Sequence, residues 1–283
     1  MGTIEGRQPE LRLPALACDA HCHVFGPAVV FPYAPERRYT PEDAPKSALI
    51  DLHERLGLQR AVIVQASCHG TDNRAMIDCL SHDPQRFRGV AIVDETVTDH
   101  DLIQMHEAGV RGVRFNFVRH LGGAPDRDVF ASVLARIALL GWHVVLHLDA
   151  PDIAELGPMI ADLKLPAVID HMGRCPAALG IEQPSFLALL ELARHPHVWV
   201  KVSGAERIAE PPFIDALPFA RALMAAIPDR VMWGTDFPHP NLKHAVDEAD
   251  LVDLLAGYGN AVMLHRLLVE NPARLYDFPR FEV

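Results

Sequence analysis

Short apolar runs rich in β-branched residues recur along the chain and alternate with amphipathic segments of helical length. The runs fall at about 17–25, 58–67, 87–94, 110–117, 143–149, 167–172, 198–204 and 231–236. Near-continuous apolar strands separated by helices are typical of a parallel sheet covered by helices. Eight such units in 283 residues favour a closed barrel over an open sheet. The predicted fold class is therefore α/β, a single (β/α)8 barrel.

The segments between the runs contain clear helical patterns and one long loop. The predicted helices cover 47–56, 72–80, 99–108, 128–140 and 185–193. Gly57, Gly109 and Gly141 follow three of them as plausible C-caps, and Asp72 is a candidate N-cap. The segment 26–46 is rich in proline and aromatic residues. It is too long for an ordinary turn between strand and helix, so we expect an active-site loop there.

Charge and cysteine content limit the partners and the compartment. The formal net charge of −11 argues against nucleic acid and anionic membranes as partners. No apolar run approaches the ~18 residues that a membrane span needs. Five cysteines, without metal-type spacing or an export signal, indicate reduced thiols in the cytoplasm. The pattern leaves the oligomeric state open.

The first residues differ in character from the rest. They lack the apolar core of a signal peptide. Residues 4–7, Ile-Glu-Gly-Arg, match a common engineered protease site and are either native or a tag remnant. We therefore predict an N-terminal extension or tag remnant at 1–16 and one barrel domain at 17–283.

Imidazole and carboxylate groups cluster at the predicted strand ends. His21 and His23 are two residues apart and so face the same side of the first strand. His147, His171 and Asp236 end the fifth, sixth and eighth strands. A barrel brings its carboxyl strand ends together at the active site. Because burying so many polar groups without a role would be costly, the cluster predicts an active site.

Longer motifs extend this pattern over nearly the whole chain. They are Cys18–Pro27 (CDAHCHVFGP), Val64–Arg74 (VQASCHGTDNR), Val113–Phe117 (VRFNF), Asp170–Arg174 (DHMGR), Trp233–Asp236 (WGTD) and Asn271–Tyr276 (NPARLY). Together they resemble the 2-pyrone-4,6-dicarboxylate lactonases, a branch of the amidohydrolase superfamily (amidohydrolase-related family 2). The resemblance implies an amidohydrolase-type barrel and a hydrolase that opens a carboxylated lactone in aromatic-compound breakdown.

The resemblance also implies roles for single residues. Asp236 is the expected general base that activates water, and His21, His23 and His171 are expected to polarise the lactone carbonyl. These roles agree with what hydrolysis requires of a base and of an oxyanion site. The expected substrate contacts are two arginines and two hydroxyl groups, Arg114, Arg207, Tyr39 and Ser67. The expected partner is thus a small anionic lactone, which arginine pairs with bidentately.

Two positions depart from the family pattern. The place of a second substrate-binding arginine is taken by His120, with Arg119 just before it, and His147 stands where the family has a tyrosine. These three positions belong to the expected substrate contacts. They leave the exact lactone open between 2-pyrone-4,6-dicarboxylate and another acidic or sugar-derived lactone, such as a sulfomuconolactone or an aldonolactone. His69, near Ser67, either faces the pocket or orders a loop.

His147 also raises the question of a metal. His21, His23, His147, His171 and Asp236 resemble the mononuclear zinc set of other amidohydrolases, and these side chains suit zinc. Arg114 stands at the end of the fourth strand, where a binuclear site has a carbamylated lysine. We favour catalysis that requires no cofactor, with zinc as the alternative. A zinc-dependent decarboxylase is the competing enzyme class, and a catalytically inactive binding module is disfavoured because the base is present.

Overall fold

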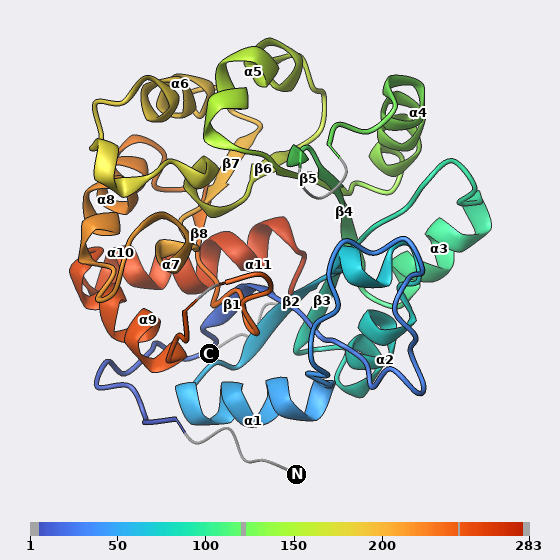
Figure 1. The fold of residues 1–283 in the computed structure, drawn as a ribbon, viewed down its shortest axis with the longest axis horizontal. Helices are drawn as coiled ribbons and strands as arrows, with labels where there is room; N and C mark the ends of the chain where they lie inside the picture. The colour runs from blue at the N-terminus through green and yellow to red at the C-terminus, as the bar shows by residue number, and fades with distance from the viewer. Residues whose placement is uncertain (1–5, 120–122, 243, 280–283) are drawn as a thin grey trace.

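The computed structural model describes residues 6–119, 123–242 and 244–279 and contains an eight-stranded parallel barrel. The strands are β1 (Cys18–Cys22), β2 (Arg60–Val64), β3 (Phe87–Ala91), β4 (Val110–Asn116), β5 (His143–His147), β6 (Ala167–Ile169), β7 (Val198–Lys201) and β8 (Val231–Met232). They pair in chain order. Backbone hydrogen bonds from Ala20 N to Trp233 O (2.9 Å) and from Asp236 N to His21 O (2.7 Å) join the last strand to the first. The predicted barrel is confirmed (Figure 1).

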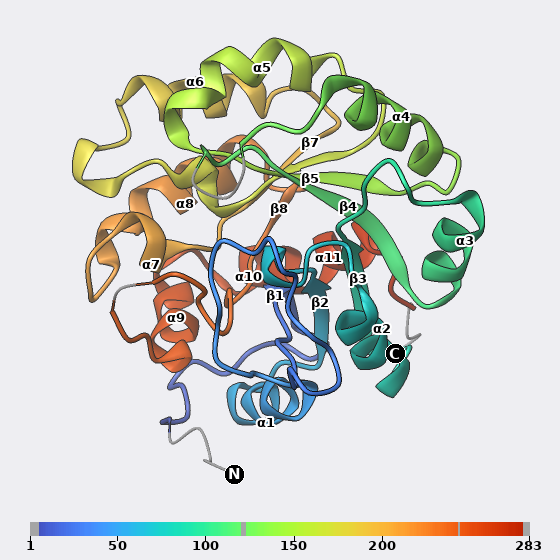
Figure 2. The ribbon, with the colours of Figure 1, turned by 45° about the vertical axis from the view of Figure 1, so that its right-hand side comes forward.

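Helices surround the barrel (Figures 1 and 2). They are α1 (Lys46–Leu56), α2 (Arg74–His82), α3 (Asp99–Glu107), α4 (Arg127–Ala138), α5 (Ile153–Ala161), α6 (Pro184–Leu192), α7 (Ala205–Ile208), α8 (Leu217–Ala226), α9 (Glu248–Leu254), α10 (Ala261–His265) and α11 (Asn271–Leu275). All five predicted helices are present. Gly57 ends α1 in the left-handed conformation, as expected of a C-cap. α2 begins at Arg74 rather than Asp72, because the Asp72 carboxylate accepts from Arg74 N and lies before the helix.

All eight strands are shorter than the predicted runs, and at β1 and β8 the difference falls at the site. β1 ends at Cys22, so His23 follows it, and β8 covers two residues of the expected 231–236. Beyond β8 the chain turns at Asp236, which has a positive φ of 62° and whose carbonyl accepts from His239 N at 2.7 Å. Apolar composition alone does not reveal such a turn.

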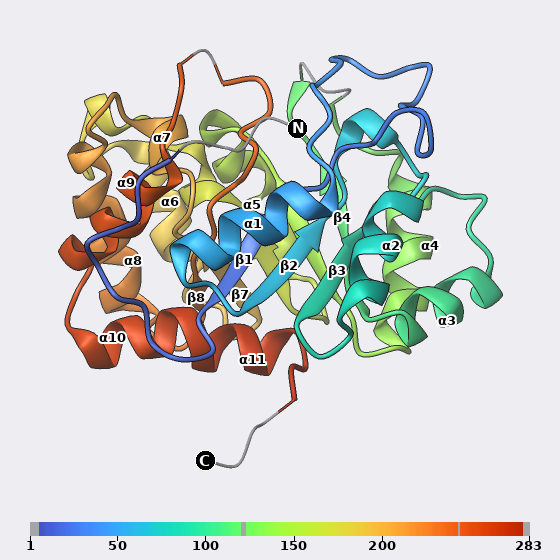
Figure 3. The same ribbon diagram turned by 90° about the horizontal axis from the view of Figure 1, so that it is seen from below.

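Apolar side chains fill the barrel interior and the layer outside it. The inner cluster includes Val62, Val90, Val145 and Val168, one from each of four strands. A larger cluster lies between the strands and the helices. In Figure 3, α10 and α11 cross one end of the barrel, while the loops after β1 and β8 rise at the other. The polar residues of the strand ends lie at that second end.

The segment before β1 lies along α9. Arg7 pairs with Asp250 and Asp253 at 2.6 Å each, and Leu11 N donates to Asp253 at 2.8 Å. The division at residue 16 stays a prediction. Within the described part of the chain, no helix is long and apolar enough to cross a membrane.

Candidate active site

The predicted strand-end residues come together in one buried cluster. His21 lies in β1, His23 directly after it, and His147 is the last residue of β5. His171 begins the short 3-10 segment η4 (His171–Arg174) that follows β6, with φ 51°. Asp236 lies beyond β8, and all five side chains are buried.

The three histidines of the predicted catalytic set converge on one carboxylate oxygen. The Nε2 atoms of His23, His21 and His171 lie 3.3, 3.5 and 3.9 Å from Asp236 Oδ1. Arg207 Nε donates to the other oxygen, Oδ2. Burial by itself raises the pKa of Asp236, but Arg207 and His171 hold that pKa well below its usual range. The Asp236 carboxylate is therefore ionised and faces three imidazole rings.

A second buried carboxylate, Asp19, positions both sides of this cluster. Asp19 Oδ1 accepts from the backbone N–H groups of His21 (3.1 Å) and Thr235 (3.0 Å). Its Oδ2 accepts from Thr235 Oγ1 at 2.6 Å and lies 3.1 Å from His53 Nε2. His21 lies in β1, and Thr235 directly precedes Asp236 after β8. By binding both residues, Asp19 links the carboxyl ends of β1 and β8.

Asp19→Ala is expected to lower the free energy of unfolding by roughly 3–5 kcal/mol. The change leaves several buried donors without an acceptor, at about 1–3 kcal/mol each. Urea unfolding followed by circular dichroism measures the loss. Asp128→Ala on exposed α4 is the control, expected to change stability by less than about 0.5 kcal/mol. An Asp19 variant as stable as that control would contradict the role.

A third carboxylate, Asp170, lies beneath the histidines among cations. Its Oδ1 lies 3.3 Å from Lys201 Nζ and 3.3 Å from His21 Nδ1. Its Oδ2 accepts from Arg114 Nε at 3.2 Å. Burial favours the neutral acid, but Lys201, His21 and Arg114 hold the pKa of Asp170 well below its usual range. Lys201 Nζ also lies 2.9 Å from His21 Nδ1.

A small pocket opens above the cluster and contains most of the predicted substrate contacts. It is lined by His23, Tyr39, Ser67, Arg114, His147, His171, Arg174, Arg207, Asp236, Pro240 and Asn241. Tyr39 reaches it from the long loop that precedes α1. Burial raises the pKa of the Tyr39 hydroxyl, which therefore stays a hydrogen-bond donor.

Sequence reasoning missed several site residues, among them Arg174, Asn241 and Lys201. Arg174 and Asn241 line the pocket, and Lys201 lies below it. Arg174 stands three residues after His171 in the quoted motif, so its place was available as a signal. A lysine inside the apolar run of β7 was another, because lysine is almost never fully buried unless paired.

Other predicted contacts are not among the groups that face Asp236. The Arg119 side chain is 82% exposed and pairs with Asp152 at 3.2 Å, outside the pocket lining. His120 lies outside the described residues. His147 lines the pocket, but its Nε2 lies 3.3 Å from Arg174 Nη1. His69 orders the loop, because its Nε2 accepts from Gly26 N at 3.2 Å and it does not line the pocket.

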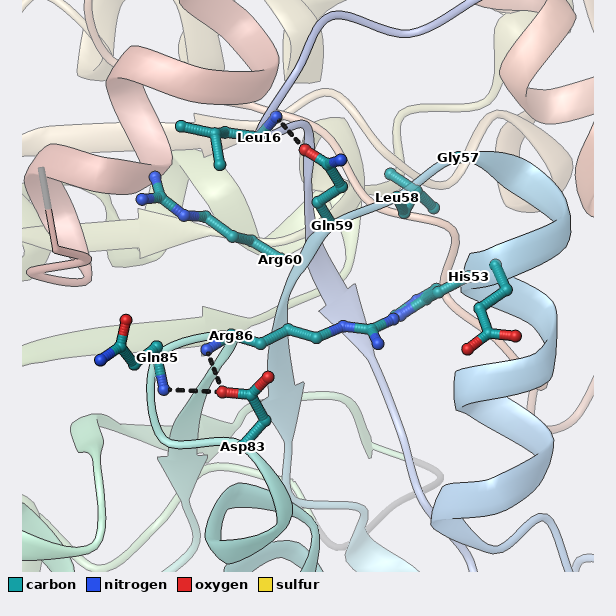
Figure 4. A pocket seen from close by; sticks show the side chains of 10 residues that line it. Leu16, His53, Gly57, Leu58, Gln59, Arg60, Asp83, Gln85 and Arg86 are labelled. Atoms are coloured by element: carbon teal, nitrogen blue, oxygen red, sulfur yellow. Dashed lines mark hydrogen bonds between the residues drawn. The ribbon is translucent and has the colours of Figure 1, made fainter. Parts of the chain in front are cut away.

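A wider hollow lies at the opposite end of the strands (Figure 4). Leu16, Gln59 and Arg86, which line it, precede β1, β2 and β3. Asp83 accepts from the backbone N–H groups of Gln85 and Arg86, and Gln59 accepts from Leu16 N. These polar groups order turns. Since barrel enzymes place their chemistry at the carboxyl strand ends, we take the smaller pocket as the active site.

The donor set is of a kind that could hold a metal ion. His21, His23 and Asp236 each offer a ligand atom within a cluster narrow enough for one ion, and so do His21, Asp170 and His171. Imidazole nitrogen and carboxylate oxygen suit zinc. His147 belongs to neither group. Lys201 places a positive charge beside His21 and Arg207 places another beside Asp236, and both charges oppose a divalent ion.

Fold and site together define a class of protein. A (β/α)8 barrel that carries a His-x-His pair, a third histidine and an aspartate at its carboxyl strand ends is a hydrolase of the amidohydrolase type. The amidohydrolase family model matches residues 18–278, and the chain belongs to this family.

Named relatives agree with this assignment over most of their length. A 2-pyrone-4,6-dicarboxylate hydrolase from Comamonas testosteroni is 46% identical, with 95% of this chain and 92% of that protein covered. A 4-sulfomuconolactone hydrolase from Rhizobium radiobacter is 42% identical, with 93% and 91% covered. A solved structure from Agrobacterium tumefaciens superposes with a TM-score of 0.86 at 27% identity, covering 96% of this chain and 100% of that one.

Proposed function

We propose that this protein is a lactonase that opens a carboxylated lactone ring, with 2-pyrone-4,6-dicarboxylate as its first candidate substrate. The observation that carries the proposal is an ionised Asp236 facing three imidazole groups at the floor of an arginine-lined pocket. The two hydrolases that resemble this chain most strongly among those described above act on acidic lactones. Five free, buried cysteines support a reducing compartment, and we propose the cytoplasm.

The proposed reaction adds water to the lactone carbonyl and breaks the ring C–O bond. Asp236 takes a proton from the attacking water, and the negative charge passes to the carbonyl oxygen. His21 and His171 polarise that oxygen from their Nε2 atoms, which face the same point. His23 is the third imidazole, with its Nε2 3.3 Å from Asp236 Oδ1. The ring oxygen leaves as a stabilised enolate and takes up the proton that Asp236 received, which gives the enol and restores the base.

The substrate's carboxylates require positive partners in a strongly acidic protein. Arg114, whose side chain is 9% exposed, lines the pocket, and its Nε donates to Asp170. Arg174 lines it from η4 and pairs with Asp149 at 3.3 Å. We propose Arg114 for one carboxylate, with Tyr39 and Ser67 as hydroxyl donors, and Arg174 for the other. Arg207 donates a hydrogen bond to Asp236, the proposed base, and lines the pocket next to it.

We further propose that hydrolysis proceeds without a metal. Lys201 and Arg207 supply positive charge where a divalent ion would otherwise act. If zinc binds, His21, His23, His171 and Asp236 would hold it, and it would supply Lewis-acid polarisation and a more acidic water.

Ring opening of 2-pyrone-4,6-dicarboxylate, followed by ultraviolet absorbance, tests the proposed function. One sample is treated with a chelator and the other is supplied with zinc. We expect turnover in both samples. Turnover only with zinc would overturn metal-free hydrolysis. Turnover of a sulfomuconolactone but not of the dicarboxylate would move the activity to the sibling substrate, and carbon dioxide release would make the protein a decarboxylase.

A further inference from the structure

The two histidines of the His-x-His pair have different partners at Nδ1. His23 Nδ1 lies 2.7 Å from the carbonyl oxygen of Val64. A carbonyl oxygen only accepts, so this nitrogen carries a proton. The Nε2 atom of His23 faces the Asp236 carboxylate, 3.3 Å from Oδ1. This is the usual arrangement of a histidine ready to bind a metal, whose other nitrogen donates to a backbone carbonyl or a carboxylate.

His21 has the opposite partner. Its Nδ1 lies 2.9 Å from Nζ of Lys201. An ammonium group only donates, so Nδ1 of His21 must accept, and the proton of the neutral ring lies on Nε2. Nε2 makes no hydrogen bond to the described residues and lies 3.5 Å from the Oδ1 atom of Asp236, which lines the pocket. His21 thus carries a free N–H aimed at the reacting centre.

Lys201 is held rigidly enough to impose this choice. Its side chain is fully buried at the end of β7, and Asp170 Oδ1 lies 3.3 Å from the ammonium. Asp170 is itself held by Arg114 at 3.2 Å. Without Lys201, Asp170 would be the remaining partner of His21 Nδ1, at 3.3 Å. A carboxylate accepts, so the proton would move to Nδ1 and the lone pair to Nε2.

We propose that Lys201 is a positioning residue that fixes His21 as the Nε2–H tautomer, so that His21 donates to the lactone carbonyl and its Nε2 offers a metal no lone pair while Lys201 is in place. This inference rests on the proposed lactone hydrolysis for its catalytic consequence. The tautomer itself follows from the donor and acceptor partners alone. A single buried lysine therefore separates a hydrogen-bonding site from a metal site built of the same histidines.

The tautomers can be measured directly in the unaltered protein. We expect 15N-labelled histidine spectra of the chelator-treated chain to give His21 a pyrrole-type Nε2 and a pyridine-type Nδ1. His23 is expected to show a protonated Nδ1. A His21 ring protonated at Nδ1 would overturn the proposal, whatever the variant below does. No substrate is needed, so this outcome is separate from failure of the proposed lactonase activity.

Lys201→Met removes the ammonium at nearly constant length. We expect His21 to change to the Nδ1–H tautomer and the zinc dissociation constant, measured by competition with a chromophoric chelator, to fall by at least tenfold, the lower end of typical effects of metal-ligand partners. Metal-free turnover is expected to fall by about 10²- to 10³-fold, as for loss of one oxyanion donor. Unchanged His21 signals and zinc affinity in a folded variant would overturn the proposal.

Lys46→Met is the matched control. Lys46 is a half-exposed lysine that pairs with Asp78 at 2.7 Å, at the start of α1 and away from the pocket. Losing this ammonium is expected to leave the histidine spectra, zinc affinity and turnover as they are. Equal effects in both lysine variants would attribute the result to net charge and overturn the local role of Lys201.

Discussion

Asp236→Asn is expected to lower kcat by about 10²- to 10⁴-fold, the range for loss of a general base. The amide keeps the shape of the side chain but cannot accept a proton from water. Because the pocket walls and Arg114 are unchanged, we expect the dissociation constant for the lactone, measured by binding to the inactive variant, to stay within about tenfold of the original KM.

A matched change outside the pocket provides the comparison. Asp152 pairs with exposed Arg119 and does not line the site. Asp152→Asn is therefore expected to keep kcat within a few-fold of the parent, since exposed ion pairs contribute little. Near-normal turnover in Asp236→Asn would remove this residue from the role of base.

Arg114→Met is expected to cost about 2–5 kcal/mol in kcat/KM, which corresponds to roughly 30-fold to several thousand-fold. The side chain is buried, and methionine leaves the substrate carboxylate without a partner in a protein of net charge −11. Asp170 keeps Lys201 beside it, so the cluster below the pocket retains a cation. Steady-state kinetics with 2-pyrone-4,6-dicarboxylate measure the loss.

Arg119→Met tests whether the effect belongs to Arg114 or to positive charge in general. Arg119 is exposed and directed to Asp152, so we expect kcat/KM to change less than about threefold. If the two variants lost activity equally, the carboxylate clamp assigned to Arg114 would be wrong.

The fold was predictable because its signal is spread over the whole chain. Eight apolar runs separated by helical segments define a barrel even though single boundaries shift, as at β1 and β8. The convergence of His21, His23, His171 and Asp236 was predictable too, because a parallel barrel places all carboxyl strand ends at one face. These conclusions depend on order along the chain and on strand direction.

The partners of each group could not be read from the order of residues. Arg119 and Arg174 are both arginines near strand ends, yet one pairs at the surface and the other lines the pocket. Arg207, expected to hold substrate, lines the pocket and also donates to Asp236. Such choices depend on side-chain directions set by loops with positive φ, as at His171 and Asp236.

The sequence alone thus determined the barrel, the family, and the gathering of the strand-end histidines and Asp236 at one face. Only the tertiary structure decided how these groups are coupled. Lys201 and His21 are separated by 180 residues and meet at 2.9 Å because β7 and β1 both end beneath the pocket. Whether an imidazole donates or accepts is fixed by the atom that faces it, and that atom comes from a distant strand.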